Sequence, residues 1–189
     1  KVDEDNSDYN ATFDALREKY GNKIAPIVVP IWDSSKKVTG IIDVLNKRAY
    51  EMQNLKRVEI AVPADKESVI EEFNDALKEA VAETDEALMD RFFEGDDFTY
   101  REMMDGLHTG VKELSMFPVL CGSGVTCLGS LMLMDHIIEL LPNPQQGNYH
   151  KATTADGKVE EFVVSPGGVP SAFVFKTVSD QFGKYSFIK

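Results

Sequence analysis

The chain has 189 residues, of which 43% are hydrophobic and 28% charged, and its formal net charge is −12. That length is enough for one or two domains with a hydrophobic core, and the composition is typical of a globular protein. No apolar run approaches the roughly 20 residues that a membrane-spanning helix needs, and the acidic N-terminus does not read as a signal peptide. The negative charge argues against direct nucleic-acid binding, because phosphate backbones attract clustered lysine and arginine. It suits either solubility alone or a basic protein partner.

The first residue is Lys1 rather than methionine, so we expect the chain to be a fragment excised from a longer protein. It contains two cysteines, Cys121 and Cys127, which are too few for a disulfide framework and fit a reducing cytoplasm. Their spacing is not that of metal ligands, and no third cysteine is present to complete a site. We therefore expect no bound metal.

The N-terminal third predicts a helix followed by strands. Apolar residues recur at helical spacing until Gly21 ends the run: Tyr9, Phe13, Leu16 and Tyr20. Residues 24–32 form an apolar, β-branched segment whose two prolines, Pro26 and Pro30, indicate an edge strand. After a turn, residues 40–45 predict a second strand, and the alternation over 57–62 predicts a third, half-buried strand.

The segment from 65 to 105 is acidic and helical. Apolar residues at helix-compatible spacing predict one long helix, or two in tandem, over 65–93, and Gly95 ends it. Thr99, followed three residues later by Glu102, is a capping box that begins a further helix. That helix carries Met103, Met104 and Leu107.

The stretch from Met116 to Gly124 is the candidate ligand site. An apolar strand over 116–121 runs into Gly122, Ser123 and Gly124, and an apolar helix follows over about 128–141. Small residues allow backbone N–H groups to approach a ligand closely. An ordinary strand-to-helix turn is the alternative explanation for the same residues.

The C-terminal part changes to a β pattern. Pro142 and Pro144 end the preceding helix, and residues 145–157 are typical of a linker. Strands are expected beyond it, over 159–164, 171–178 and 185–188. We therefore predict an α/β part up to about Pro144, followed by the opening of a separate β domain.

Five segments carry a family resemblance: KVDEDNSDY, IVVPIWDSSKKVTGIIDVLNKRAYEM, EIAVPADKESVIEEFNDALKEAVAETDEALMDRFFEGDDFTYREMMDGLHTG, FPVLCGSGVTCLGSLMLMDHIIELLPNP and PSAFVFKTVSDQFGKYSFIK. In this order they resemble bacterial elongation factor G, and they cover essentially the whole chain. The resemblance implies a P-loop GTPase G domain of α/β fold with an α+β insertion, called G′, and then the first strands of a β-barrel, domain II. Residues 1–23 would follow the Asn-Lys-x-Asp motif and 24–114 would be the insertion. Residues 115–144 would close the G domain, and 145–189 would be a linker and a truncated domain II.

The same resemblance implies a guanine pocket with two walls. Asp3 would end the Asn-Lys-x-Asp motif and accept hydrogen bonds from the guanine ring N–H and exocyclic amine, which adenine does not offer in that arrangement. Lys1 would lay its aliphatic stem along the base, whereas without the family context Lys1 to Asp3 would be a solvated terminus. Ser123 and Gly124 would bring backbone N–H groups to the guanine O6. The chain departs from the family at Gly124, usually alanine, and over 125–128, usually a lysine-containing stretch.

The residues needed for hydrolysis are not found in this sequence. Phosphoryl transfer requires a glycine-rich phosphate loop with its lysine, ligands for Mg²⁺ and a group that positions water. The chain contains no Gly-x-x-x-x-Gly-Lys-Ser/Thr motif. We expect a parent GTPase that binds GTP or GDP with Mg²⁺, while this chain alone is inactive, binds GDP very weakly and holds no nucleotide. The histidines His108, His136 and His150 have neither the spacing of a catalytic base with its nucleophile nor that of metal ligands. The aromatic residues Trp32, Tyr50 and Phe73 are expected in the core.

The resemblance implies that the partner is the ribosome and that the protein is cytoplasmic. We expect neither a membrane partner nor direct nucleic-acid binding by this chain. In the family the G′ insertion offers a helical face to the stalk protein of the large ribosomal subunit, here the acidic helices of 65–105. Acidic side chains around apolar anchors suit a basic, mobile partner, and a solvated face without a partner is the alternative. The candidate residues are Glu71, Glu72, Asp75, Glu79, Glu83 and Asp85.

Three functions are consistent with these observations. The first is a fragment of an elongation factor G-like GTPase that promotes GTP-dependent ribosomal translocation. The second is a divergent paralogue, such as a ribosome-protection or recycling factor, which the departures at Gly124 and Val125 keep open. The third, from a different class, is an acidic protein-binding module without nucleotide function.

Overall fold

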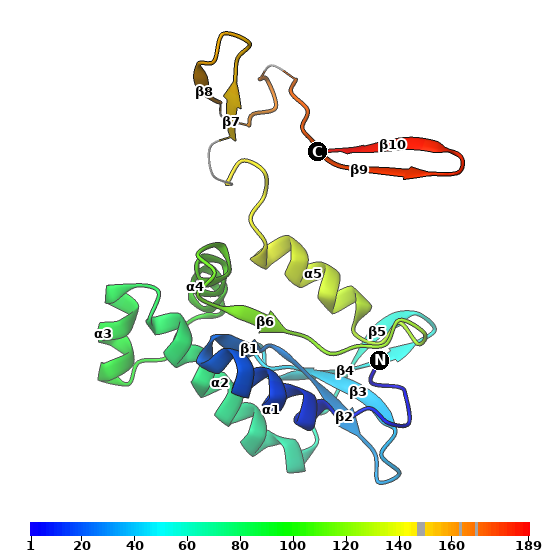
Figure 1. Ribbon diagram of the computed structural model, residues 1–189. Helices are drawn as coiled ribbons and strands as arrows, with labels where there is room; N and C mark the ends of the chain where they lie inside the picture. The colour runs from blue at the N-terminus through cyan, green and yellow to red at the C-terminus, as the bar shows by residue number, and fades with distance from the viewer. Residues whose placement is uncertain (147–149, 163, 169) are drawn as a thin grey trace. The chain divides into compact units, whose positions relative to one another are not determined.

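The computed structural model describes residues 1–146, 150–162, 164–168 and 170–189. The chain divides into two compact units, Lys1–Leu141 and Pro142–Lys189, which are described separately (Figure 1). The first unit mixes helices and strands, and the second contains only strands and turns among its described residues. This arrangement confirms the predicted fold class, an α/β part followed by a β-rich part.

The first unit contains five α-helices, two short 3₁₀ helices and six strands among its described residues. In chain order they are α1 (Tyr9–Tyr20), η1 (Gly21–Lys23), β1 (Ile24–Pro26), β2 (Val28–Trp32), β3 (Val38–Asp43), β4 (Arg48–Gln53), β5 (Lys56–Ile60), η2 (Ala64–Lys66), α2 (Glu67–Ala82), α3 (Glu86–Glu94), α4 (Tyr100–Lys112), β6 (Phe117–Val119) and α5 (Ser130–Leu140).

The strands of this unit form two sheets that meet at Ile27. Strands β2 to β5 make a four-stranded antiparallel sheet in sequence order, with β2 at its edge, whereas β1 pairs in parallel with β6. The Ile27 N–H donates to the Val119 carbonyl at 3.0 Å, and its carbonyl accepts from the Val44 N–H at 3.1 Å. The expected single strand over 24–32 is therefore two strands in different sheets, although the edge position predicted from Pro30 is confirmed for β2.

The acidic segment contains two helices in tandem, α2 and α3, followed by α4. Of the two alternatives predicted for residues 65–93, one long helix or two in tandem, the second is confirmed. Helix α3 begins at the Asp85 cap and ends at Gly95, whose φ is +81°, the left-handed conformation that glycine adopts readily. Helix α4 begins with the predicted capping box, in which the Thr99 side chain accepts from the Glu102 N–H and the Glu102 side chain accepts from the Thr99 N–H.

Aliphatic side chains from the four-stranded sheet and the helices form the core. Ile27, Ile41, Leu77 and Leu107 are buried almost completely and belong to one apolar cluster. Met103 and Met104 of α4 are also buried in it. The aromatic residues expected in the core are partly buried against it: Trp32, Tyr50 and Phe73.

The second unit consists of two antiparallel hairpins, β7 (His150–Thr153) with β8 (Val159–Phe162) and β9 (Val174–Asp180) with β10 (Gly183–Ile188). Strand β7 lies inside the segment 145–157 that was expected to be a linker, so that expectation is wrong for its second half. The Gly157 turn, with φ +84°, allows the hairpin. Of the strand expected over 159–164, Val163 lies outside the described residues. No described residue of this unit is buried.

Candidate nucleotide-binding loop

The structure brings the first three residues against the loop that follows β6, although they are far apart in the sequence. The Lys1 amino nitrogen donates to the Gly122 carbonyl at 2.7 Å, and the Val2 N–H approaches the same oxygen at 3.3 Å. The Val2 side chain is 8% exposed and belongs to the core cluster. The two segments that the sequence assigned to opposite walls of one pocket are therefore neighbours.

Asp3 and Ser123 contact each other directly. Hydrogen bonding with the Ser123 side chain is the largest reason why the pKa of Asp3 lies below its ordinary 3.8. The Ser123 oxygen also accepts from the Thr126 N–H at 3.1 Å. Because Ser123 is only 2% exposed, its hydroxyl is held in place between the loop turn and the carboxylate. The lowered pKa keeps Asp3 ionised at neutral pH.

Two glycines explain why the loop folds so tightly. A Cβ on Gly122 would lie 2.8 Å from the Leu128 carbonyl oxygen, and a Cβ on Gly129 would lie 2.6 Å from the Cys121 carbonyl oxygen. Gly129 also has a φ of +80°, so a side chain there would be strained as well as crowded. The Ser123 N–H donates to the Leu128 carbonyl at 2.9 Å and closes the loop.

The loop presents backbone N–H groups at its tip. Gly124 is exposed with open space around it, and Val125 is 85% exposed. Within the part of the chain that the structure describes, no hydrogen bond uses the N–H group of either residue. Since the Ser123 N–H already donates to Leu128, the N–H groups that remain for a ligand are those of Gly124 and Val125.

The Lys1 side chain is held only loosely. It is 89% exposed, and its Nζ lies 3.6 Å from Oε1 of Glu4, a weak surface pair. This leaves the aliphatic stem free to lie along a ligand. Its contact with a base stays a prediction.

A hollow of about 600 Å³ reaches the start of the candidate loop and is lined by Lys1 and Gly122. It is lined by the N-terminal segment, by apolar residues of α1 such as Phe13 and Leu16, and by residues 119–122. Asp3, Ser123 and Gly124 do not line it, so we do not assign the guanine contacts to this hollow.

The other candidate reactive groups are placed as follows. Burial raises the pKa of the Cys121 thiol to about 12, so it is not a nucleophile at neutral pH. His136 is buried in α5, and Nδ1 of His108 lies 3.1 Å from the Leu140 carbonyl oxygen. Among the described residues no group of three or more histidine, cysteine or acidic side chains is arranged to hold a metal ion. None of the helices in the described residues is long and apolar enough to cross a membrane.

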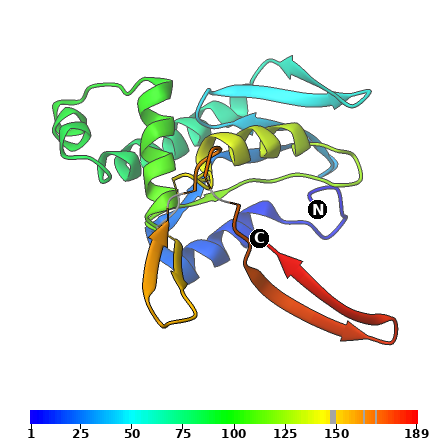
Figure 2. The same ribbon diagram turned by 90° about the horizontal axis from the view of Figure 1, so that it is seen from above.

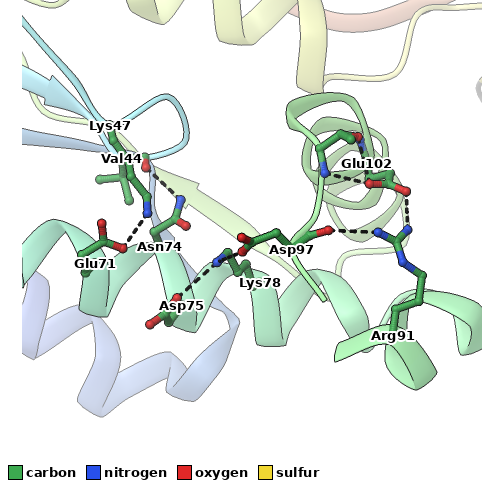
Figure 3. A network of polar contacts seen from close by, with 10 residues as sticks. Val44, Lys47, Glu71, Asn74, Asp75, Lys78, Arg91, Asp97 and Glu102 are labelled. Carbon is green, nitrogen blue, oxygen red and sulfur yellow. Dashed lines mark hydrogen bonds and ion pairs between the residues drawn. The ribbon is translucent and has the colours of Figure 1, made fainter. Parts of the chain in front are cut away.

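The six candidate acidic residues in and between α2 and α3 divide into two sets. Glu71 pairs with Lys47 and Asp75 with Lys78 (Figure 3). Asp85 caps α3, so these three have contacts within the fold. Glu72, Glu79 and Glu83 are exposed, and none of them forms an ion pair with any residue that the structure describes. Their spacing places all three on one face at α2. This unpaired face is the part of the predicted acidic surface that is free for a partner.

The sequence did not identify every residue that shapes the loop. Gly129, Leu128 and Thr126 were not singled out, although each makes a contact on which the loop depends. The available signal was a second glycine at the start of the apolar helix. Its close approach to Cys121 could not be read from spacing.

Comparison with known proteins fits this geometry. No protein-family model matches the chain. A curated elongation factor G-like protein from Thermotoga maritima is 33% identical over 193 residues, which covers 100% of this chain and 27% of that protein. The chain is thus similar to an elongation factor G-like protein over its whole length. The resemblance inferred from its motifs is thereby confirmed.

A solved structure agrees with the sequence relative. A crystal structure from Thermus thermophilus matches with a TM-score of 0.76 at 28% identity and covers 100% of this chain and 26% of that one. The chain therefore spans about a quarter of the length of each relative. The boundaries of the G′ insertion at 24 and 114, and of the following part at 144, stay predictions.

Proposed function

We propose that this chain supplies the guanine-recognising part of a translational GTPase. The observation that carries the proposal is the contact of Asp3 with Ser123, which joins a partly exposed, ionised carboxylate to a loop with free N–H groups at Gly124 and Val125. A carboxylate accepts from the guanine ring N–H and amine, and the loop N–H groups donate to its O6. The residues present fit the base of GTP or GDP.

The phosphates and Mg²⁺ would be held by residues outside this chain, since its sequence has no phosphate loop. When bound, Mg²⁺ neutralises charge on the transferred phosphoryl group. We propose that the parent protein hydrolyses GTP to drive ribosomal translocation in the cytoplasm. A ribosome-protection or recycling factor is the second candidate, favoured by the loop residues Gly124 and Val125.

Substitution of Asp3 tests the guanine assignment. In the full-length protein, Asp3→Asn keeps one acceptor oxygen and replaces the other with an NH2 donor, which matches the carbonyl that xanthine has in place of the guanine amine. We expect weaker GDP binding, by about tenfold or more, and tighter xanthosine diphosphate binding. Asp5→Asn, close by in the sequence, is the matched control. Equal loss of both nucleotides in Asp3→Asn would contradict the assignment.

The isolated chain should bind GDP very weakly, because the contacts to the phosphates are missing. Calorimetry of the 189-residue chain tests this. A submicromolar dissociation constant would show that the guanine contacts suffice and that the role given to the absent phosphate loop is wrong.

The acidic helices support a second proposal, binding to the stalk protein of the large ribosomal subunit. Glu72, Glu79 and Glu83 form an unpaired acidic face on α2, and Phe93 of α3 is 79% exposed. Exposed aromatic groups among unpaired charges suit a basic partner. This binding would operate together with the nucleotide site, or alone if the chain is only a binding module.

Charge reversal on α2 tests stalk-protein binding separately from nucleotide binding. Glu79→Lys with Glu83→Lys should weaken stalk-protein binding at low salt and leave GDP binding by the full-length protein unchanged. Glu18→Lys, an equally exposed change on α1, is the control. Unchanged stalk-protein affinity at low salt would overturn this second proposal.

A further inference from the structure

The candidate loop and the start of α5 are packed on the four-stranded sheet. In Figure 2, α5 runs alongside strands of this sheet. Tyr50, Met52 and Arg57 of β4 and β5 face Leu128 and Met132 across a crevice of about 10 Å³. That space holds no more than one water molecule, so this is a packed contact rather than a ligand pocket.

Arg57 forms the polar part of this contact. Its Nη1 donates to Oδ2 of Asp135 on α5 at 2.8 Å, and its guanidinium lies 5.1 Å from the centre of the Tyr50 ring. A planar guanidinium that is stacked on an aromatic ring loses little freedom when it binds a carboxylate. Arg57 therefore links β4 and β5 to α5 through a partly exposed ion pair and a ring contact.

The position of α5 in turn determines the position of the loop. The Leu128 carbonyl accepts from the Ser123 N–H at 2.9 Å, and Gly129 is in close contact with the Cys121 carbonyl. The first helical bond of α5 runs from the Leu133 N–H to the Gly129 carbonyl at 2.9 Å. Because these contacts connect α5 directly to the loop, we expect a shift of α5 to move Ser123 and the neighbouring Gly124 N–H.

We propose that Arg57 is a positioning residue for the guanine site. Through Asp135 and Tyr50 it holds α5, and through Leu128 and Gly129 it holds the loop N–H groups that face the guanine O6. The four-stranded sheet thereby sets guanine affinity without touching the base. The inference rests on the proposed function.

The test pairs a residue change with a change of one ligand atom. In the full-length protein we compare Arg57→Gln, Asp135→Asn and the double variant. The probes are GDP, the analogue with sulfur in place of the guanine O6, and inosine diphosphate, which lacks the amine. Each single variant should weaken GDP binding by about three- to tenfold. The affinity for the sulfur analogue should fall less, because sulfur accepts the loop hydrogen bonds poorly even in the unsubstituted protein.

Two ratios separate positioning from general damage. The preference for GDP over the sulfur analogue should fall in the variants, while the preference for GDP over inosine diphosphate, which reports on Asp3, should not change. The double variant should be no worse than either single one, because both remove the same contact. Arg48→Gln, which breaks the exposed Arg48–Glu59 pair at 3.5 Å in the same sheet, is the control and should change neither ratio.

A uniform loss for all three nucleotides would overturn the inference and leave Arg57 with a structural role only. An unchanged ratio of GDP to the sulfur analogue would overturn it equally. If the unsubstituted protein does not prefer GDP over either analogue, the proposed guanine site itself fails, and the inference fails with it.

Discussion

The two candidate surfaces of the first unit are stabilised in different ways. The loop side, residues 1–3 and 122–129, depends on backbone groups, such as the Ser123 N–H that donates to Leu128 at 2.9 Å. On the helix side, α2 to α4 bury Leu77 and Leu107 in the apolar core, and charged side chains link the exposed surfaces of these helices. Nζ of Lys78 lies 2.8 Å from Asp97, and Arg91 pairs with Glu102 (Figure 3).

This difference determines which changes each side tolerates. Backbone contacts do not titrate, but they leave no room for additional atoms. Exposed ion pairs accept differences in side-chain size, but they weaken with protonation and with salt. The loop should therefore be sensitive to shape, and the exposed ion pairs of the helix side to charge and pH.

The largest expected effect is that of Gly129→Ala on the loop side. The new Cβ would lie 2.6 Å from the Cys121 carbonyl oxygen, at a φ of +80°. Strain and crowding together should lower the free energy of unfolding by about 2–4 kcal/mol. Urea denaturation of the chain measures this.

Gly124→Ala is the matched control in the same loop. No atom would lie within 4 Å of the new Cβ, and the φ of Gly124 is not positive. The free energy of unfolding should change by less than about 0.5 kcal/mol. Equal effects of the two substitutions would show that the loop is not as tightly packed as described.

Ser123→Ala should have the next largest effect. It leaves the Thr126 N–H without its acceptor and removes a donor from Asp3, at a site that is 2% exposed. We expect a loss of about 1–2 kcal/mol in stability and a rise in the pKa of Asp3 toward 3.8. Denaturation and NMR titration of Asp3 measure the two effects.

Ser35→Ala, in an exposed turn, is the control for both measurements. If the pKa of Asp3 stays the same in Ser123→Ala, the hydroxyl does not orient the carboxylate. The two walls of the candidate site would then be neighbours without being coupled.

Local signals in the sequence predicted the helix side well. The capping box at Thr99 and Glu102 and the end of α3 at Gly95 are confirmed, because caps are set by neighbouring residues. Strand β4 was missed, because its half-buried residues carry no clear alternation. The hairpin around Gly157 was also missed, because its turn resembled the polar residues of a linker.

The loop side was predicted only in outline. The family motifs identified Asp3 and Ser123, but the hydrogen bond between them depends on a contact between distant segments. Pairing such as that of β1 with β6 and of Arg57 with Asp135 has no local signal either. These contacts follow from tertiary packing, which periodicity does not encode.

Thr99→Ala on the helix side should have a smaller effect. It removes the N-cap of α4, in which the Thr99 oxygen accepts from the Glu102 N–H. Loss of such a cap costs about 1 kcal/mol. Thr109→Ala is the control, because that hydroxyl bonds back to the Asp105 carbonyl within the helix and caps nothing. If both variants lose the same stability by urea denaturation, the capping box contributes nothing specific.

The smallest expected effect is the pH dependence of the helix side. The Arg91 guanidinium, together with Thr99, lowers the pKa of Glu102 from its ordinary 4.5 to about 2. A carboxyl whose pKa is lower in the folded state stabilises the fold above its unfolded pKa and loses that contribution as pH falls. The contribution of Glu102 should therefore be complete above about pH 4.5 and disappear toward pH 2.

Glu102→Gln tests this prediction against the loop side. The difference in melting temperature between the unsubstituted chain and Glu102→Gln should shrink steadily as the pH is lowered through that window. The difference for Gly129→Ala should stay nearly constant over the same range, since its cause is steric. If the melting-temperature difference for Gly129→Ala also shrinks at low pH, acid destabilises the loop together with the helices. Steric packing and charge would then not act on separate sides of the unit.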